Sequence, residues 1–261
     1  MLPAAPAIAF AEVSKRYGEG AAPVLDRVSI EVAGREFLAV VGPSGSGKTT
    51  LLRLINRLIE PTEGIVRVEG EDVRAVDAVG LRRRIGYVFQ GVGLFPHMTV
   101  AENIAITPRL LGWDAARIAP RVDELIELVR LDRSRHRDRV PAELSGGERQ
   151  RVGVARALAA APRIVLMDEP FGALDPLTRD ALGDDYRRLH DRLGLTTVMI
   201  THDMQEALLL ADRIAVMRDG RIIANGAPRA LLADRQDDYV RELMAAPRRQ
   251  AERLRALEQQ A

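Results

Sequence analysis

The sequence of 261 residues exceeds the ~100–200 residues of an average domain, so it fits one large α/β domain or a core with a subdomain. Hydrophobic residues make up 47% and charged residues 29%, which excludes a disordered chain. The formal charge of +1 excludes a global field that recruits nucleic acid, and the absence of cysteine excludes disulfides, thiolate zinc sites and cysteine nucleophiles. We expect no nucleic-acid partner and a cytoplasmic setting.

The apolar start of the sequence, 1–13, carries no Lys or Arg ahead of Ala9-Phe10-Ala11, so we predict no signal peptide. No apolar run approaches the ~20 residues that span a bilayer. Any role at a membrane is therefore expected to come through a partner chain.

Short apolar stretches predict the strands of the fold. Alternation of apolar residues at Ile8, Phe10 and 28–32 predicts antiparallel strands near the start of the chain. Wholly apolar runs are typical of parallel strands that are covered on both faces. These runs lie at 37–41, 164–167 and 198–200.

Helical spacing of apolar residues predicts helices at 49–58, 115–131 and 147–161. The region 90–155 has little strand signal, so we interpret it as a helical insertion. The end of the chain, 229–261, predicts two or three helical stretches. Its last part alternates Arg with acids and Gln, which favours a solvated helix over a basic binding patch.

Polar residues follow the apolar strands. Gly42 follows the first run, Asp168 and Glu169 follow the second, and His202 follows the third. In an open parallel sheet the ligand lies beyond the carboxyl ends of the strands. We therefore expect these four residues to converge on one crevice.

The segment after the first apolar run matches the phosphate-binding P-loop pattern, and it lies between a predicted strand and a predicted helix. Its glycines let backbone N–H groups wrap phosphates, and the helix N-terminus adds partial positive charge. Lys48 is expected to reach the β- and γ-phosphates, and Thr49 to hold Mg²⁺. The alternative is a tight glycine turn with a surface lysine. The predicted nucleotide-binding residues here are Gly42, Pro43, Ser44, Gly45, Ser46, Gly47, Lys48, Thr49 and Thr50.

Two consecutive carboxylates end the apolar run at 164–167. Neighbouring side chains of a strand point apart, but the chain turns at a strand end. We therefore expect Asp168 to serve the Mg²⁺ shell while Glu169 polarises a nucleophilic water. The alternative is an exposed acidic pair that ends a strand.

The segment 144–150 reads LSGGERQ and has both a structural and a chemical interpretation. Ser145 and Glu148 form a capping box, which predicts the start of a helix. Gly146 and Gly147 in its first turn each disfavour a helix by up to ~1 kcal/mol, so we expect a group to approach this backbone closely. A phosphate at the helix N-terminus fits, with the Ser145 hydroxyl as a further donor.

On these motifs the sequence resembles the ABC-family ATPases over about residues 7–245, and LSGGERQ is similar to the family signature. The resemblance implies an α/β fold: a P-loop (RecA-like) parallel-sheet core with an N-terminal antiparallel β subdomain and a helical subdomain insertion. It implies ATP and Mg²⁺ as cofactors. It also implies a homodimer in which the signature of one copy closes over the nucleotide that the P-loop of the other copy binds. The signature residues implied to face that nucleotide are Ser145, Gly146, Gly147 and Gln150.

The resemblance divides the chain into three parts. The core with its antiparallel subdomain takes 1–89 and 156–226, the helical subdomain takes 90–155, and a C-terminal helical extension takes 227–261.

The resemblance gives roles to four further residues. Tyr17 is placed like the family's adenine-stacking aromatic, and Gln90 like the glutamine that touches Mg²⁺ and the water. Asp175 belongs to the loop that crosses the dimer interface, and it also predicts a helix cap before Pro176. His202 resembles the switch histidine that contacts the γ-phosphate. The implied catalytic residues are Glu169, His202 and Gln90, and the implied metal ligands are Thr49, Gln90 and Asp168.

A second capping box and the remaining histidines carry structural expectations only. Asp203 and Glu206 form the capping box and predict a helix after the strand at 198–200. His97, His136 and His190 lie in no comparable context, and we assign them no role.

The segments 91–113 and 56–62 resemble the ATPase subunits of osmoprotectant importers, which carry quaternary amines such as glycine betaine or choline. The resemblance implies a peripheral subunit on the cytoplasmic face of the inner membrane. Its implied partners are permease subunits that dock on 91–113 and, indirectly, a solute-binding protein. Many osmoprotectant ATPases carry paired CBS modules after the cassette, which this sequence lacks, so we expect no ionic-strength gating within it.

Two alternatives stay open. Importers of other small polar solutes, such as amino acids, share much of these segments. Soluble ABC-type ATPases of translation or DNA repair usually carry two cassettes or a long coiled coil, whereas this sequence has one P-loop, one signature and no sustained heptads. A nucleotide kinase would leave the signature unexplained.

Overall fold

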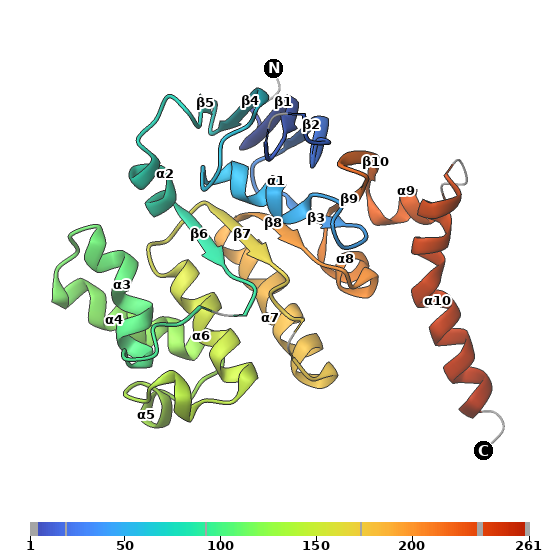
Figure 1. The fold of residues 1–261 in the computed structure, drawn as a ribbon. Helices are drawn as coiled ribbons and strands as arrows, with labels where there is room; N and C mark the ends of the chain where they lie inside the picture. The colour runs from blue at the N-terminus through green and yellow to red at the C-terminus, as the bar shows by residue number, and fades with distance from the viewer. Residues whose placement is uncertain (1–4, 19, 92, 173, 234–236, 259–261) are drawn as a thin grey trace.

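The computed structural model describes residues 5–18, 20–91, 93–172, 174–233 and 237–258. Within these ranges a six-stranded sheet has the order β10-β9-β3-β8-β7-β6 (Figure 1). All neighbouring strands are parallel except β10, which runs antiparallel to β9. The strands are β3 (Phe37–Val41), β6 (Ile85–Val88), β7 (Ile164–Asp168), β8 (Thr196–Ile200), β9 (Arg213–Arg218) and β10 (Arg221–Gly226).

The apolar run of β3 is explained by burial on both faces of this sheet. Leu38 and Val40 pack into one hydrophobic cluster, whereas Phe37, Ala39 and Val41 pack into another on the opposite face. Residues of β7 and β8 divide in the same alternating way. A strand covered on both sides needs apolar residues at every position, and the prediction of parallel strands is confirmed.

The first cluster lies between the large sheet and a four-stranded antiparallel sheet of order β2-β1-β4-β5. Its strands are β1 (Ile8–Lys15), β2 (Leu25–Val32), β4 (Glu63–Val68) and β5 (Glu71–Asp72). Helix α1 (Lys48–Ile55) fills the space between the sheets (Figure 1). This helix is shorter than the predicted 49–58, because Arg57 takes a left-handed φ of 52° and ends it at Asn56.

Helices cover the other face of the large sheet, and the chain between β6 and β7 folds as one helical group (Figure 1). The division of the chain at residues 90 and 155 stays a prediction, and α6 runs across the second of these positions. The group comprises α3 (Val100–Leu110), α4 (Ala115–Leu128), α5 (Arg133–His136), a 3-10 turn (Pro141–Glu143) and α6 (Gly146–Leu158). The remaining helices are α2 (Ala78–Arg84), α7 (Pro176–Leu193), α8 (Met204–Leu210), α9 (Pro228–Ala233) and α10 (Asp238–Glu258).

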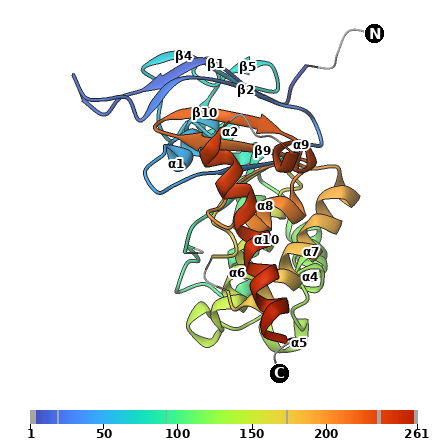
Figure 2. The same ribbon diagram turned by 90° about the vertical axis from the view of Figure 1, so that its right-hand side faces the viewer.

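The C-terminal helix α10 begins against the body of the protein, where Val240 and Met244 are buried. Figures 1 and 2 show it running down one side of the molecule, with its last turns standing apart from the other helices. No helix in the described ranges is long and apolar enough to cross a bilayer.

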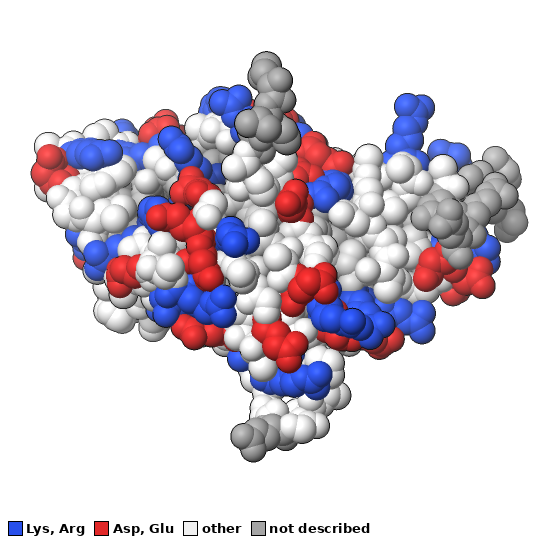
Figure 3. All heavy atoms as spheres, turned by 90° about the horizontal axis from the view of Figure 1, so that it is seen from above, with Lys and Arg blue, Asp and Glu red and all other residues white. Residues whose placement is uncertain are grey.

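Charges of both signs mix on the surface above the antiparallel sheet. Figure 3 shows described Lys and Arg side chains interspersed with Asp and Glu on this face, without a broad field of either sign. Ion pairs such as Arg221 with Asp26 account for part of this pattern.

Candidate functional site

The glycine-rich loop between β3 and α1 is shaped by its own backbone. Gly47, the residue before α1, is left-handed with φ 99°. Lys48 is buried, and its Nζ donates to the carbonyl oxygens of Gly42 and Pro43, at 2.8 Å each. The Ser46 hydroxyl is also buried and has no hydrogen-bond partner among the residues that the structure describes. A buried hydroxyl without a partner is unfavourable, so it marks a place where an external acceptor or donor fits.

Gly42 is the position in this loop with the least room for a side chain. It has φ +150°, and a Cβ added there would lie 2.1 Å from the carbonyl oxygen of Met217 on β9. We expect Gly42→Ala to lower the free energy of unfolding by about 2 kcal/mol or more, because backbone has to move. Gly45→Ala is the matched control: Gly45 has φ +80° but no atom within 4 Å of the added Cβ, so a loss of about 1 kcal/mol is expected. Urea denaturation measures both, and equal losses would contradict this account.

The first carboxylate after β7 meets the loop. The Thr49 hydroxyl donates to Asp168 Oδ1 at 3.4 Å. Burial raises the pKa of Asp168, and the hydrogen bond from Thr49 partly opposes that shift. Burial lowers the pKa of Lys48, against the attraction of Glu169 and Asp168. A cation close to Asp168 would favour its ionised form.

Glu169 turns away from the strand direction, as the sequence led us to expect. It has a left-handed φ of 47°, and its N–H donates to the carbonyl oxygen of Ile200 at 3.0 Å. Its carboxylate accepts from Gln90 Nε2 at 3.0 Å and lies 3.3 Å from Nδ1 of His202. A strained backbone held by neighbouring strands is a recurring feature of functional sites. The structure thus brings β7, β8 and the segment after β6 together at the P-loop.

The LSGGERQ segment forms the start of α6, which packs on the opposite face of the large sheet from α1 (Figure 1). The predicted capping box of Ser145 and Glu148 is confirmed: the Ser145 hydroxyl accepts from Glu148 N at 3.2 Å, and Glu148 accepts from Ser145 N at 2.7 Å. Gly146 is exposed, and a Cβ added there would meet only the flexible end of the Arg149 side chain, at 4.0 Å, among the described residues. An added Cβ at Gly147 would lie 3.2 Å from Thr178 Cγ2, so packing within the chain explains this second glycine.

Gln150 is less accessible than the other predicted signature residues. It is 3% exposed, whereas Ser145 and Gly146 lie on the surface. A direct contact from Gln150 to a nucleotide on another copy stays a prediction. Five positions after the cap, α6 has turned this residue onto its buried face.

Tyr17 and Asp175 lie outside the central cluster. Tyr17 is 52% exposed, with Lys15 Nζ 5.3 Å from its ring centroid, so its ring is open to a stacking partner. Asp175 caps α7 by accepting from Thr178 N at 3.0 Å, with Pro176 in the first turn, as predicted. The side chain of Thr178, together with this backbone hydrogen bond, lowers the pKa of Asp175.

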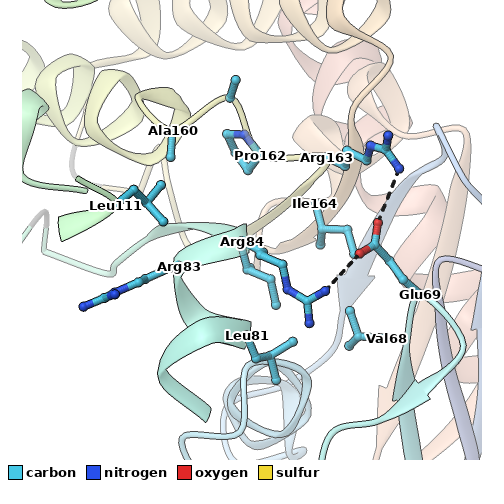
Figure 4. A pocket seen from close by; sticks show the side chains of 12 residues that line it. Val68, Glu69, Leu81, Arg83, Arg84, Leu111, Ala160, Pro162, Arg163 and Ile164 are labelled. Carbon is cyan, nitrogen blue, oxygen red and sulfur yellow. Dashed lines mark ion pairs between the residues drawn. The ribbon is translucent and has the colours of Figure 1, made fainter. Parts of the chain in front are cut away.

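A separate hollow of about 310 Å³ lies at the other end of the strands (Figure 4). Ile85 and Ile164, the first residues of β6 and β7, line it, whereas the candidate site lies at the carboxyl ends of the strands. Arg84 and Arg163 point toward Glu69, each with a guanidinium nitrogen 3.9 Å from its carboxylate. Arg84 and Arg163 are thus paired with Glu69, and the hollow lies at the opposite ends of β6 and β7 from the site described above.

The ABC transporter family model matches residues 25–172, a span that contains the P-loop, the signature and both carboxylates after β7. The chain belongs to the ABC transporter family. It is 48% identical over 236 residues to the choline transport ATP-binding protein OpuBA of Bacillus subtilis. The matched residues make up 90% of this chain and 61% of that relative. It is also 48% identical over 235 residues to the glycine betaine uptake system ATP-binding protein YehX of Escherichia coli. These residues make up 90% of this chain and 75% of that relative.

A solved ABC cassette confirms the fold. The chain matches a dimeric ATP-binding cassette in a post-hydrolysis state with bound ADP and Pi, at a TM-score of 0.77 and 33% identity. The match covers 84% of this chain and 98% of the solved chain. The expected P-loop core with an antiparallel sheet and a helical insertion is thereby confirmed.

Sequence reasoning missed a network that links two loops of this ABC cassette. Arg179 on α7 donates to Asp203 at 3.0 Å and to the carbonyl oxygen of Leu174 at 3.2 Å. The expected capping box at Asp203 is half wrong: Asp203 caps α8, but the Glu206 carboxylate accepts from the Thr201 hydroxyl at 2.6 Å instead of the cap backbone. Glu206 is buried beside β8, and burial raises its pKa. The only feature of the sequence that pointed to this network is the position of Arg179, one turn after Asp175.

Two further side chains hold the segment around Gln90, and sequence patterns gave no hint of either. Asn103 is fully buried, accepts from Phe95 N at 2.8 Å and donates to the carbonyl oxygens of Phe95, Met98 and Thr99. Arg156, near the end of α6, donates to the carbonyl oxygen of Gly93 at 2.7 Å. The helix that begins at the signature therefore also holds the loop after Gln90.

Proposed function

We propose that this chain is the ATP-hydrolysing subunit of an importer and works as a homodimer around two Mg-ATP. The observation that carries this proposal is the cluster at the carboxyl ends of β3, β7 and β8. There a P-loop lysine, a hydroxyl–carboxylate pair and a carboxylate held by Gln90 and His202 meet. Purified protein should therefore hydrolyse ATP in the presence of Mg²⁺, and a coupled phosphate-release assay tests this directly.

The residues fit a nucleotide and Mg²⁺. The Ser46 hydroxyl needs a partner, and Gly42 and Gly47 leave no room for side chains that would keep phosphates away from the loop backbone. Lys48 would exchange its two backbone carbonyl partners for phosphate oxygens. Thr49 and Asp168 supply the oxygen ligands that Mg²⁺ prefers, and Gln90 adds an amide oxygen nearby. Bound Mg²⁺ would neutralise charge on the phosphates.

In this proposal Glu169 orients the attacking water. Gln90 donates to one of its carboxylate oxygens and the His202 ring lies at the other, so the carboxylate has a fixed orientation at the end of β7. It would accept a proton from the water as the water oxygen bonds to the terminal phosphorus and the bond from that phosphorus to ADP breaks. The exposed ring of His202 would steady the charge that develops there. Tyr17 would stack on the adenine from the edge of the site.

The signature would complete the site from a second copy. The N-terminus of α6 presents free N–H groups and the Ser145 hydroxyl to an open surface at Gly146. Such an end favours a phosphate group. The solved relative with ADP and Pi is itself dimeric.

A groove between the core and the helical group would receive the permease. It has a volume of about 380 Å³, and Phe89, Phe95 and Leu110 line it although they are between 40% and 55% exposed. Exposed apolar side chains that line one groove mark an interaction site. The apolar groove fits a short amphipathic helix of an integral membrane subunit.

We expect Leu110→Asp to reduce binding of the purified chain to stripped native membranes by about tenfold, because it places a charge on the apolar docking surface. Nucleotide binding should stay unchanged. Leu232→Asp on α9 is the matched control, since both leucines are 55% exposed. A sedimentation assay compares the two variants, and equal membrane binding would refute the groove as the docking site.

The cargo we propose is an osmoprotectant such as glycine betaine or choline. The support is the naming of OpuBA as a choline transport protein and of YehX as a glycine betaine uptake protein, each about half identical to this chain. Deleting the gene should abolish uptake of the radiolabelled amine by the host at raised osmolarity. Normal amine uptake with lost uptake of an amino acid would favour the alternative importer. An ATPase that never copurifies with an integral membrane protein would favour a soluble role.

A further inference from the structure

His136 is a buried histidine whose ring is fully partnered, although no motif in the sequence includes it. It ends the short helix α5 and is 7% exposed. Its Nδ1 lies 2.8 Å from the carbonyl oxygen of Asp132, and its Nε2 lies 2.9 Å from Oε1 of Glu148. The second contact joins α5 to the first turn of the signature helix.

The partners of the ring decide its protonation. The Asp132 carbonyl oxygen can only accept, so Nδ1 must carry a hydrogen. The ionised Glu148 carboxylate also only accepts, so Nε2 must carry one as well. Hydrogen bonds from Ser145 and His136 lower the pKa of Glu148 to about 2, which keeps it ionised. Both ring nitrogens are therefore positioned to donate, one to α5 and one to the signature helix.

Glu148 connects His136 to the backbone at the start of the signature helix. Its Oε1 faces His136, while its Oε2 accepts from the backbone N–H of Ser145 at 2.7 Å. One carboxylate thus ties the cap of α6 to α5. The segment after His136 is fixed in turn, because the carbonyl oxygens of Arg137 and Arg139 accept from the first turn of α3. The cap of α6 therefore contacts α5, and the segment that follows α5 is itself hydrogen-bonded to α3.

We propose that His136 is a positioning residue of the signature, and that it holds the Glu148 carboxylate and thereby the Ser145 cap in the orientation that closes over a triphosphate on the second copy. This inference rests on the proposed function. His136 itself touches no nucleotide. Without its bond, Glu148 has one fixed oxygen instead of two, and the serine hydroxyl and N–H groups of the cap lose their fixed direction.

Two amide substitutions separate the two contacts of the ring. In His136→Gln the amide nitrogen takes the place of Nε2 and still donates to Glu148. In His136→Asn it takes the place of Nδ1, keeps Asp132 and loses Glu148. We expect His136→Asn to lower kcat for ATP hydrolysis about tenfold, the effect of one charge-assisted hydrogen bond, and His136→Gln to stay within about threefold of the parent. Binding of a fluorescent ATP analogue to the P-loop of the isolated copy should be unchanged in both.

A double-mutant cycle shows whether His136 acts through Glu148. The kcat of His136→Asn combined with Glu148→Ala should equal that of Glu148→Ala alone. Equal activity of the Asn and Gln variants, or full additivity in the cycle, would overturn the inference. Ser145→Arg separates this from the proposed function: if it abolishes hydrolysis while His136→Asn does not, only the role of His136 is wrong. If Ser145→Arg hydrolyses ATP normally, the proposed function itself fails.

Discussion

We expect the replacement of Glu169 with Gln to lower ATP hydrolysis by about a thousandfold while ATP binding persists, because the amide cannot accept the proton of the attacking water. The substitution keeps the shape of the side chain, and the amide oxygen can still accept from Gln90 Nε2, 3.0 Å away in the parent. Bound ATP would then hold two copies together, since hydrolysis is the step that releases them. Single-turnover hydrolysis and size-exclusion chromatography with ATP measure both effects.

Asp203→Asn is the matched control for this experiment. Asp203 is a carboxylate near His202, but it caps α8 and pairs with Arg179 instead of facing the P-loop. Its loss should reduce turnover only severalfold, through the position of the loop. A Glu169→Gln variant that hydrolyses ATP at the parent rate would show that another group accepts the proton.

Lys48→Ala is expected to weaken ATP binding about a hundredfold, because it removes a buried charged group that we propose to contact the phosphates. The carboxylates of Asp168 and Glu169 then lose a positive neighbour, which adds to the repulsion of the triphosphate. Equilibrium titration with a fluorescent ATP analogue measures the change. Lys15→Ala removes the same charge beside Tyr17 and should change the affinity less than threefold.

The central sheet and the candidate site follow from local patterns in the sequence. The apolar runs of β3, β7 and β8 indicate strands that are buried on both faces. The polar residues that follow them indicate the edge of the sheet at which a ligand is expected. The P-loop glycines are recognised from the spacing of the motif, although the backbone carbonyls that leave no room for a Cβ at Gly42 and Gly47 belong to the distant Met217 and Val24. The strands and the loop can be predicted because the apolar runs and the motif spacing are local in the sequence.

Features that depend on distant contacts could not be predicted. The burial of Gln150 follows from how α6 packs in the helical group, which LSGGERQ does not encode. The same holds for Glu206, which Thr201 draws away from the helix cap. His136 acquires its contact with Glu148 only when α5 meets α6, so its position in the sequence is uninformative.

The central claim is that each ATP is held by the P-loop of one copy and the signature of the other, and a mixed dimer tests it most directly. In a Glu169→Gln background, chains carrying Lys48→Ala are mixed with chains carrying Ser145→Arg, and occluded radiolabelled ATP is counted per dimer. Neither variant alone should occlude ATP, because both of its sites are damaged. The mixture should occlude one ATP per mixed dimer, since that dimer pairs an intact P-loop with an intact signature once. No recovery on mixing, or full occlusion by Ser145→Arg alone, would contradict the shared site.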